Sequence, residues 1–269
     1  MKNSEINIRD PFVLLYNDTY YMYGSRMGVQ MGFDVYMSED LENWSEPKSV
    51  FEANDGFWGE KDFWAPEVHL YNGKFYMLAT FKAEGKCRAT AILVSDTPDG
   101  KFTFYADNIT PSDWECLDGT LYVENGIPYM VFCHEWVQVE NGEICAVELS
   151  EDLKKTVGAP FVLWRAGDAK WVKPIFDNNL VTDGPFLYRS ENGTLKSLWS
   201  SFSDGYVLAT AESDSGSIRG NWTVADDFLY SKDGGHGMIF ETKDGRKMVS
   251  VHSPNTKFNE RPVFFEFEG

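Results

Sequence analysis

Three aspartates and one histidine stand at corresponding points along the chain, each just ahead of a short apolar run and a tight-turn signal. Asp10 begins Asp-Pro-Phe-Val, Asp118 begins Asp-Gly-Thr-Leu, Asp183 begins Asp-Gly-Pro-Phe and His236 begins His-Gly-Met-Ile. Folding alone gives no reason to gather several carboxylates, because each one raises the pKa of its neighbours. Acid/base catalysis needs carboxylates with separated pKa values, so this pattern predicts an active site.

The chemistry narrows to a hydrolase that uses carboxylates in an aromatic pocket. The chain has no Gly-x-Ser-x-Gly nucleophile motif and no Gly-rich phosphate loop, and its four cysteines have neither Cys-x-x-Cys pairing nor metal-ligand spacing with the histidines. Sugars dock on aromatic faces, and aromatic residues flank the aspartates. The residues that we expect to bind substrate are Trp64, Trp136 and Phe186, together with Glu67.

A repeat must position these side chains. Five turn signals recur, among them Asn72-Gly73, Asn125-Gly126 and Asp244-Gly245, and each lies between short runs of β-branched and aromatic residues. Five units in 269 residues correspond to roughly one per 54 residues, about the size of a four-stranded propeller blade. A two-sheet sandwich has no reason to repeat one signature five times. The sequence therefore predicts an all-β, five-bladed β-propeller, with residues 1–269 as a single domain.

The phase of the repeat predicts that these residues meet at one end of the central channel. In a propeller the first strand of each blade lines that channel. Four of the five units place an ionisable residue at the same phase. The second unit has Ala65 there, but Glu67, two residues later, lies on the same face of a strand.

The overall charge excludes several classes of partner. Lys and Arg number 24 against 42 Asp and Glu, which gives a formal net charge of -18. Such a surface repels phosphate backbones and anionic lipid heads, so we expect neither nucleic acid nor membrane as a partner. The first ten residues contain no apolar signal-peptide core, so we expect a cytoplasmic protein. The oligomeric state stays open.

Five motifs in order resemble the signature of glycoside hydrolase family 43. They are Arg9–Phe12, Phe63–Glu67, Leu117–Leu121, Asp183–Pro185 and Gly235–Gly237. The resemblance covers nearly the whole chain. It implies a five-bladed propeller of the kind found in arabinofuranosidases, β-xylosidases, arabinanases and exo-galactanases.

The resemblance also implies roles for individual acids in an inverting reaction. Asp10 matches the general base that activates water, and Asp118 matches the aspartate that tunes and orients the acid. Asp183 matches the general acid, although the family usually has a Glu there, which is one methylene longer. This departure keeps two other candidates for the acid, Glu135 first and Glu67 second.

The implied function is exo-acting hydrolysis of small oligosaccharides that carry arabinofuranosyl or xylosyl units. A non-catalytic sugar-binding propeller, or a related glycosidase acting on galactan or fructan fragments, is the alternative. His236 resembles a channel histidine that helps to hold a calcium or sodium ion, and no cofactor is required. We expect the choice of sugar to depend on four rim loops, Met27–Phe33, Asn54–Lys61, Val137–Gly142 and Pro254–Arg261.

Overall fold

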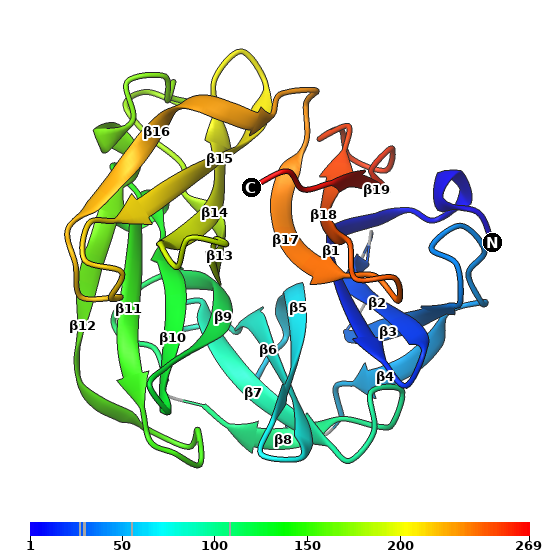
Figure 1. Cartoon of the computed structure of the whole chain (residues 1–269). Coiled ribbons are helices and arrows are strands. Elements are labelled where there is room, and N and C mark those ends of the chain that lie inside the picture. The colour runs from blue at the N-terminus through cyan, green and yellow to red at the C-terminus, as the bar shows by residue number, and fades with distance from the viewer. Residues whose placement is uncertain (27, 29–30, 55, 108) are drawn as a thin grey trace.

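The computed structural model describes all residues except 27, 29–30, 55 and 108 (Figure 1). Two of the predicted specificity loops, 27–33 and 54–61, therefore lie partly outside the described residues. All four cysteines are free thiols. Among the described residues, no helix has both the length and the apolar character needed to cross a membrane.

The described chain consists almost entirely of short antiparallel strands, in the order in which they form sheets. The first sheet contains β1 (Ile8–Tyr16), β2 (Thr19–Arg26), β3 (Gly32–Ser38) and β4 (Lys48–Glu52). The second contains β5 (Lys61–Tyr71), β6 (Lys74–Lys82), β7 (Ala89–Ser95) and β8 (Thr103–Ala106). The third contains β9 (Cys116–Glu124), β10 (Ile127–His134), β11 (Glu143–Leu149) and β12 (Thr156–Arg165). The fourth contains β13 (Asp183–Arg189), β14 (Leu195–Phe202), β15 (Tyr206–Ser213) and β16 (Trp222–Tyr230). The fifth contains β17 (Gly235–Glu241), β18 (Lys247–Ser253) and β19 (Arg261–Glu266), and the short helices are η1 (Asn3–Glu5), α1 (Trp136–Val139) and η2 (Ala166–Asp168).

These five sheets are the blades of a propeller, which confirms the predicted fold class (Figure 1). The first strands of the blades, β1, β5, β9, β13 and β17, contact one another in a closed ring around the channel. The predicted hairpin turns are present as well. Asn72-Gly73 and Asn125-Gly126 have positive φ at both residues, as two-residue turns between twisted strands require.

Aromatic side chains fill the space between adjacent blades. Phe33 of blade 1 packs against Phe63 and Phe81 of blade 2, with ring centroids 6.0 Å and 5.9 Å away. Between blades 3 and 4, Trp164 lies 6.2 Å from Trp199. Burying a side chain of this size stabilises the fold by about 1.5–3 kcal/mol, so these layers hold the blades at fixed angles around the channel.

Side chains close the ring between the first and last blades. Asn7 Nδ2 donates to the backbone oxygen of Glu260 at 2.9 Å, and Arg9 Nη1 lies 3.3 Å from the Glu260 carboxylate. Glu260 is fully buried. Ser250 also donates to the backbone oxygen of Pro11 at 2.5 Å. Asp10 therefore stands at the seam where the two ends of the propeller meet.

Every first strand is interrupted at the same level. The pairing with the second strand shifts there in all five blades, as at a β-bulge. One residue at each interruption has a left-handed backbone. These residues and their φ values are Asp10 (54°), Ala65 (45°), Asp118 (57°), Gly184 (51°) and His236 (51°).

Each interrupted backbone amide needs a new hydrogen-bond acceptor, because a buried amide without a partner is unfavourable. In four blades the acceptor comes from the second strand of the preceding blade. The pairs are Ala65 N to Ser25 Oγ (2.7 Å), Asp118 N to Thr80 Oγ1 (2.9 Å), His236 N to Ser200 Oγ (2.7 Å) and Asp10 N to His252 Nδ1 (3.3 Å). In the fourth blade, Gly184 N donates instead to the Asp118 carboxylate at 3.0 Å. These five bonds, the amide ring, link each blade to the next.

Removing one acceptor of the amide ring should weaken the fold. Thr80 is fully buried, and Thr80→Val keeps its shape but leaves the Asp118 amide unpaired. We expect the free energy of unfolding to fall by about 1–3 kcal/mol in urea denaturation. Thr223→Val, at an exposed position in β16, serves as the control and should change it by less than about 0.5 kcal/mol. Equal effects of the two variants would show that the amide ring adds nothing.

Candidate active site

A pocket of about 600 Å³ lies at one end of the channel, next to the residues of the amide ring. Asp10, Asp118, Asp183 and His236 all line it. The structure thus brings together the four ionisable residues that the repeat singled out. At the bulges the strand ladder is already broken, so Pro11 and Pro185 follow without losing a ladder hydrogen bond.

Asp183 reaches this pocket from a different backbone position than the repeat predicted. The left-handed residue of blade 4 is Gly184, and Asp183 precedes it, level with Arg9 and Trp64 of the earlier blades. A Cβ at Gly184 would lie 2.8 Å from the His236 ring, so a side chain does not fit there. The prediction that Asp183 shares the phase of Asp10 is therefore wrong by one residue, because His236 occupies the space.

Asp10 lies among groups that favour its charged form. It accepts a hydrogen bond from Ser25 Oγ at 2.6 Å, and His236 Nδ1 is 3.2 Å from its other oxygen. Burial alone would raise the pKa of Asp10, but the charges of His236 and Arg9 and the bond from Ser25 lower it to about 2. Asp10 is therefore ionised at neutral pH and can accept a proton.

His252 supports Asp10 as a neutral ring. Its Nδ1 accepts the Asp10 amide, so the proton must be on Nε2, which lies 3.2 Å from Asn255 Oδ1. Burial is the main reason that the pKa of His252 falls to about 3. A neutral imidazole fits both contacts.

Asp118 of blade 3 faces residues of blades 4 and 5. It is 6% exposed, and its Oδ2 accepts the Gly184 amide at 3.0 Å and lies 3.6 Å from His236 Nδ1. Burial, with smaller contributions from Asp10 and Glu67, raises the pKa of Asp118 to about 6 against the lowering effect of His236 and the Gly184 amide. Its carboxylate adds to the cost of ionising the next acid, Asp183.

Asp183 has the opposite surroundings to Asp10. Burial and the neighbouring Asp118 raise its pKa to about 7, although His236, Tyr206 and Arg9 act the other way. Tyr206 donates its hydroxyl to Asp183 Oδ2 at 3.0 Å, and burial holds the pKa of Tyr206 well above its usual value. Because Oδ2 accepts this bond, the proton of neutral Asp183 belongs on Oδ1. Asp183 can therefore donate a proton near neutral pH.

Glu135, the first alternative acid, also lines the pocket but is held by a cation. Its carboxylate forms an ion pair with Arg88, which also pairs with Asp62 at 2.9 Å and lies 4.6 Å from the centre of the Trp64 ring. Burial raises the pKa of Glu135, and Arg88 opposes the rise. An acid tied to an arginine is less suited to giving up and regaining a proton.

Two predicted substrate-binding residues lie elsewhere, and two lie in the pocket. Glu67, the second alternative acid, is 6% exposed, pairs with His69 at 3.1 Å and does not line the pocket. Phe186 lines a hollow on the far side of the bulges with His69. Trp64 and Trp136 both line the pocket as predicted.

His236 offers only part of a metal site. Its Nε2 is buried and has no hydrogen-bond partner among the described residues, while Nδ1 faces Asp10 and Asp118. Within the described residues, no group of three or more His, Cys, Asp or Glu side chains could hold a metal ion. The protein would thus supply one nitrogen, and other ligands would have to come from solvent. The ion stays a prediction, as does the absence of a cofactor requirement.

Sequence reasoning missed the residues that tune the acids. The acceptors Ser25, Thr80, Ser200 and His252 each follow their turns by the same number of residues, so extending the alignment to the second strands would have found them. Tyr206 and Arg88 carry no such signal, because both contact the site from positions outside the first and second strands of their blades.

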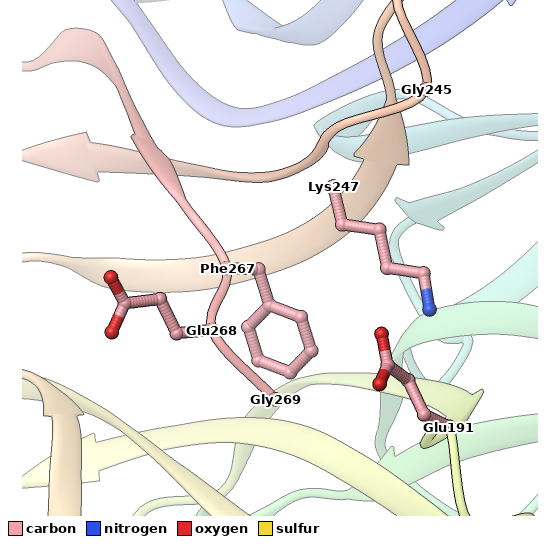
Figure 2. A pocket seen from close by; sticks show the side chains of 6 residues that line it. All are labelled: Glu191, Gly245, Lys247, Phe267, Glu268 and Gly269. Carbon is pink, nitrogen blue, oxygen red and sulfur yellow. The ribbon is translucent and has the colours of Figure 1, made fainter.

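A second hollow, of about 420 Å³, lies near the C-terminal residue and does not belong to the site. Figure 2 shows the Lys247 and Glu191 side chains extending toward each other beside the Phe267 ring. The residues that line this second hollow come from the turns that follow β13 and β17, at the ends of these strands away from the active-site pocket, and from the C-terminal segment. None of the predicted site residues lines it.

Comparison with known proteins places this geometry in a family. The sequence model of glycosyl hydrolases family 43 matches residues 4–264. A solved endo-arabinase from Bacteroides thetaiotaomicron is 41% identical, with a TM-score of 0.95, over 100% of this chain and 97% of that one. A solved endo-1,4-beta-xylanase from the same organism is 26% identical, with a TM-score of 0.79, over 99% and 92%.

Curated sequences show the same similarity at lower identity. Alpha-L-arabinofuranosidase 43 of Humicola insolens is 21% identical over 265 residues, which are 90% of this chain and 53% of that protein. The chain spans about half the length, or less, of the curated relatives that it matches.

The raised pKa of Asp183 predicts how stability depends on pH. Between its usual value of 3.8 and about 7, the folded protein keeps a proton that the unfolded chain has lost. The stabilisation is complete below about pH 4 and is lost as the pH rises through about 7. Asp183→Asn cannot ionise, so its free energy of unfolding relative to wild type should be higher at about pH 8 than at about pH 4, by an amount on the order of 4 kcal/mol.

Urea denaturation at both pH values measures this difference. The matched control is Asp204→Asn, because the Asp204 carboxylate is 94% exposed. That variant should show the same difference from wild type at both pH values. If Asp183→Asn behaves like the control, Asp183 titrates normally in the folded protein.

Proposed function

The chain belongs to glycoside hydrolase family 43, and we propose that it hydrolyses glycosidic bonds of arabinose- or xylose-containing saccharides with inversion at the anomeric carbon. In this proposal Asp10 is the general base and Asp183 is the general acid. Asp118 keeps the pKa of Asp183 high. Arabinan-type chains are the proposed first substrate.

The observation that carries this proposal is the difference in pKa between two partly buried carboxyl groups that line one pocket. The pKa of Asp10 is lowered to about 2, while that of Asp183 is raised to about 7. One group is therefore charged and the other neutral over most of the range between these values. Inverting glycosidases need this combination, with a carboxylate on one side of the sugar and a carboxylic acid on the other.

The residues divide the reaction as follows. Asp10 takes a proton from a water molecule, which attacks the anomeric carbon while the bond to the leaving oxygen breaks. Asp183 gives its Oδ1 proton to that oxygen, so the leaving group departs as an alcohol. Inverting enzymes hold the two carboxyl groups roughly 6.5–9.5 Å apart to admit the water. Afterwards Asp10 returns its proton to solvent, and Asp183 regains one.

Aromatic side chains around the pocket provide the sugar-binding surface. Trp64 is 37% exposed, and the Arg88 guanidinium stacked on it fixes the ring. Trp136 lines the pocket from blade 3, and Phe258, at 55% exposure, lines it from the loop before β19. Sugar rings present C–H faces that pack on such surfaces. This supports a saccharide substrate of more than one ring.

The names of the relatives support arabinose over xylose. The endo-arabinase from Bacteroides thetaiotaomicron covers the whole chain at 41% identity, whereas the xylanase reaches 26%. The name of the endo-arabinase also gives an endo mode of cleavage, so the exo mode expected from the sequence is not confirmed. We keep release of terminal sugars as a prediction, which the length of the products tests. Location in the cytoplasm is likewise a prediction, tested by cell fractionation.

A substrate panel tests the proposed function. We expect purified protein to release sugar from linear arabinan, arabino-oligosaccharides or nitrophenyl arabinofuranoside, with xylan and nitrophenyl xyloside as the second choice. Asp10→Asn, which keeps the shape but not the basicity of the side chain, should lower kcat by about 10³-fold. Thermal unfolding confirms that the variant is folded.

Three outcomes would contradict the proposal. Measurable sugar binding with no release from any substrate would favour a non-catalytic propeller. Release from galactan or fructan fragments alone would favour a related glycosidase of different specificity. Near-normal activity of Asp10→Asn would remove Asp10 as the base.

The identity of the acid is tested by leaving-group dependence. An activated leaving group such as dinitrophenolate needs no protonation, so an acid variant keeps much of its rate on that substrate. We expect Asp183→Ala to lose about 10²–10⁴-fold in kcat on arabino-oligosaccharides and far less on the activated substrate. Glu135→Ala is the matched comparison and should lose rate equally on both.

The pH profile gives an independent check on the same residue. Asp183 must be protonated, so the kcat/KM of wild type should fall as the pH rises through about 7. That limb should disappear in Asp183→Ala on the activated substrate. If Glu135→Ala shows this behaviour instead, Glu135 is the acid.

A further inference from the structure

The second strands of the five blades contain one corresponding position beside the channel. Its residues pair across the strand ladder with the residue that precedes each bulge, and each follows its turn by the same number of residues. The five residues, blade by blade, are Ser25, Thr80, Cys133, Ser200 and His252. Four of them accept the bulge amide of the next blade, at 2.7–3.3 Å.

Cys133 is the exception. By position it should receive the amide of Gly184, as Ser25 receives that of Ala65. A thiol sulfur is a weak hydrogen-bond acceptor, much poorer than a hydroxyl oxygen. The Gly184 amide is bonded instead to Asp118 Oδ2, which comes from the first strand of the same blade as Cys133.

The amide of Gly184 is the main anchor of the Asp118 carboxylate. Among the described residues this carboxylate accepts no other hydrogen bond, and His236 Nδ1 is 3.6 Å away. Gly184 directly follows Asp183 in the chain. The bond therefore places the charge of Asp118 next to Asp183, as the proposed acid function requires.

We propose that Cys133 is a positioning residue of the active site, because its thiol leaves the Gly184 amide free to hold Asp118 beside Asp183. A hydroxyl at this position would take the amide, as it does in blades 1, 2 and 4, and Asp118 would lose its anchor. The substitution of cysteine for a hydroxyl residue thus couples blade 3 to the acid of blade 4. The catalytic part of this inference rests on the proposed function.

Two substitutions at one position test this inference. Cys133→Ser introduces the competing hydroxyl, whereas Cys133→Ala introduces no acceptor. We expect Cys133→Ser to lower kcat on arabino-oligosaccharides about tenfold and to leave KM unchanged. This loss is part of the roughly 10²–10⁴-fold in rate that a positioned acid contributes. On a dinitrophenyl substrate, which needs no proton, it should lose less than about twofold. Cys133→Ala should stay within about twofold of wild type on both.

Cys145→Ser is the matched control. Cys145 is as fully buried as Cys133 but lies in β11 and packs in a different core cluster. Any loss caused by a buried hydroxyl alone should appear in this variant too, on both substrates equally. Thermal unfolding of all three variants separates loss of fold from loss of positioning.

A crystal structure of Cys133→Ser separates this inference from the proposed function. We expect the introduced hydroxyl within hydrogen-bond distance of Gly184 N and Asp118 Oδ2 displaced from it, whatever substrate the protein hydrolyses. If Asp118 keeps the amide, or if Cys133→Ala loses as much activity as Cys133→Ser, the inference is wrong. If the hydroxyl takes the amide but no variant or wild type cleaves any saccharide, the proposed function alone fails.

Discussion

Each bulge removes one backbone amide from its strand ladder, and the site depends on the need of that amide for a new hydrogen-bond acceptor. A buried N–H must find an acceptor, and in this fold the neighbouring blade supplies it. The same left-handed turn of the backbone that frees the amide aims the side chains of Asp10, Asp118 and His236 into the pocket. The same bulges therefore both link neighbouring blades by hydrogen bonds and place the ionisable groups in the pocket.

Two carboxyl groups of one pocket have unlike chemistry, because their partners differ. Asp10 has a serine hydroxyl and a histidine against its carboxylate, and Arg9 nearby. Asp183, one residue before the bulge position of blade 4, has a neutral tyrosine and the charge of Asp118 beside it. Burial opposes ionisation of both, so the sign of the neighbouring charges determines which one is ionised. The net charge of the whole molecule, -18, has little to do with either.

Much of this arrangement could be predicted from local sequence signals. Turn residues such as Asn72-Gly73 predicted the number of blades. The repeat also predicted that Asp10 and Asp118 lie at the end of the channel, where both line the pocket. The register of Asp183 could not be predicted, because Gly184 is required by contact with a ring from blade 5. The alternation of faces along a strand predicted Glu67 beside Ala65, but the strand register shifts between Trp64 and Glu67, and Glu67 pairs with His69 outside the pocket. The Arg88 contact with Glu135 likewise joins two blades, and no local pattern reports it.

The seam between the first and last blades has a consequence for when the protein becomes competent. Asp10 leaves the ribosome well before its amide acceptor, His252, and its ion-pair partner, His236, because His252 follows it by 242 residues. Until the fifth blade has been synthesised and docked, Asp10 has Arg9 and Ser25 beside it but lacks His236, the neighbour that lowers its pKa most. In the proposed mechanism, a chain that stops before blade 5 would therefore lack a properly ionised base, so closure of the ring is a precondition for catalysis.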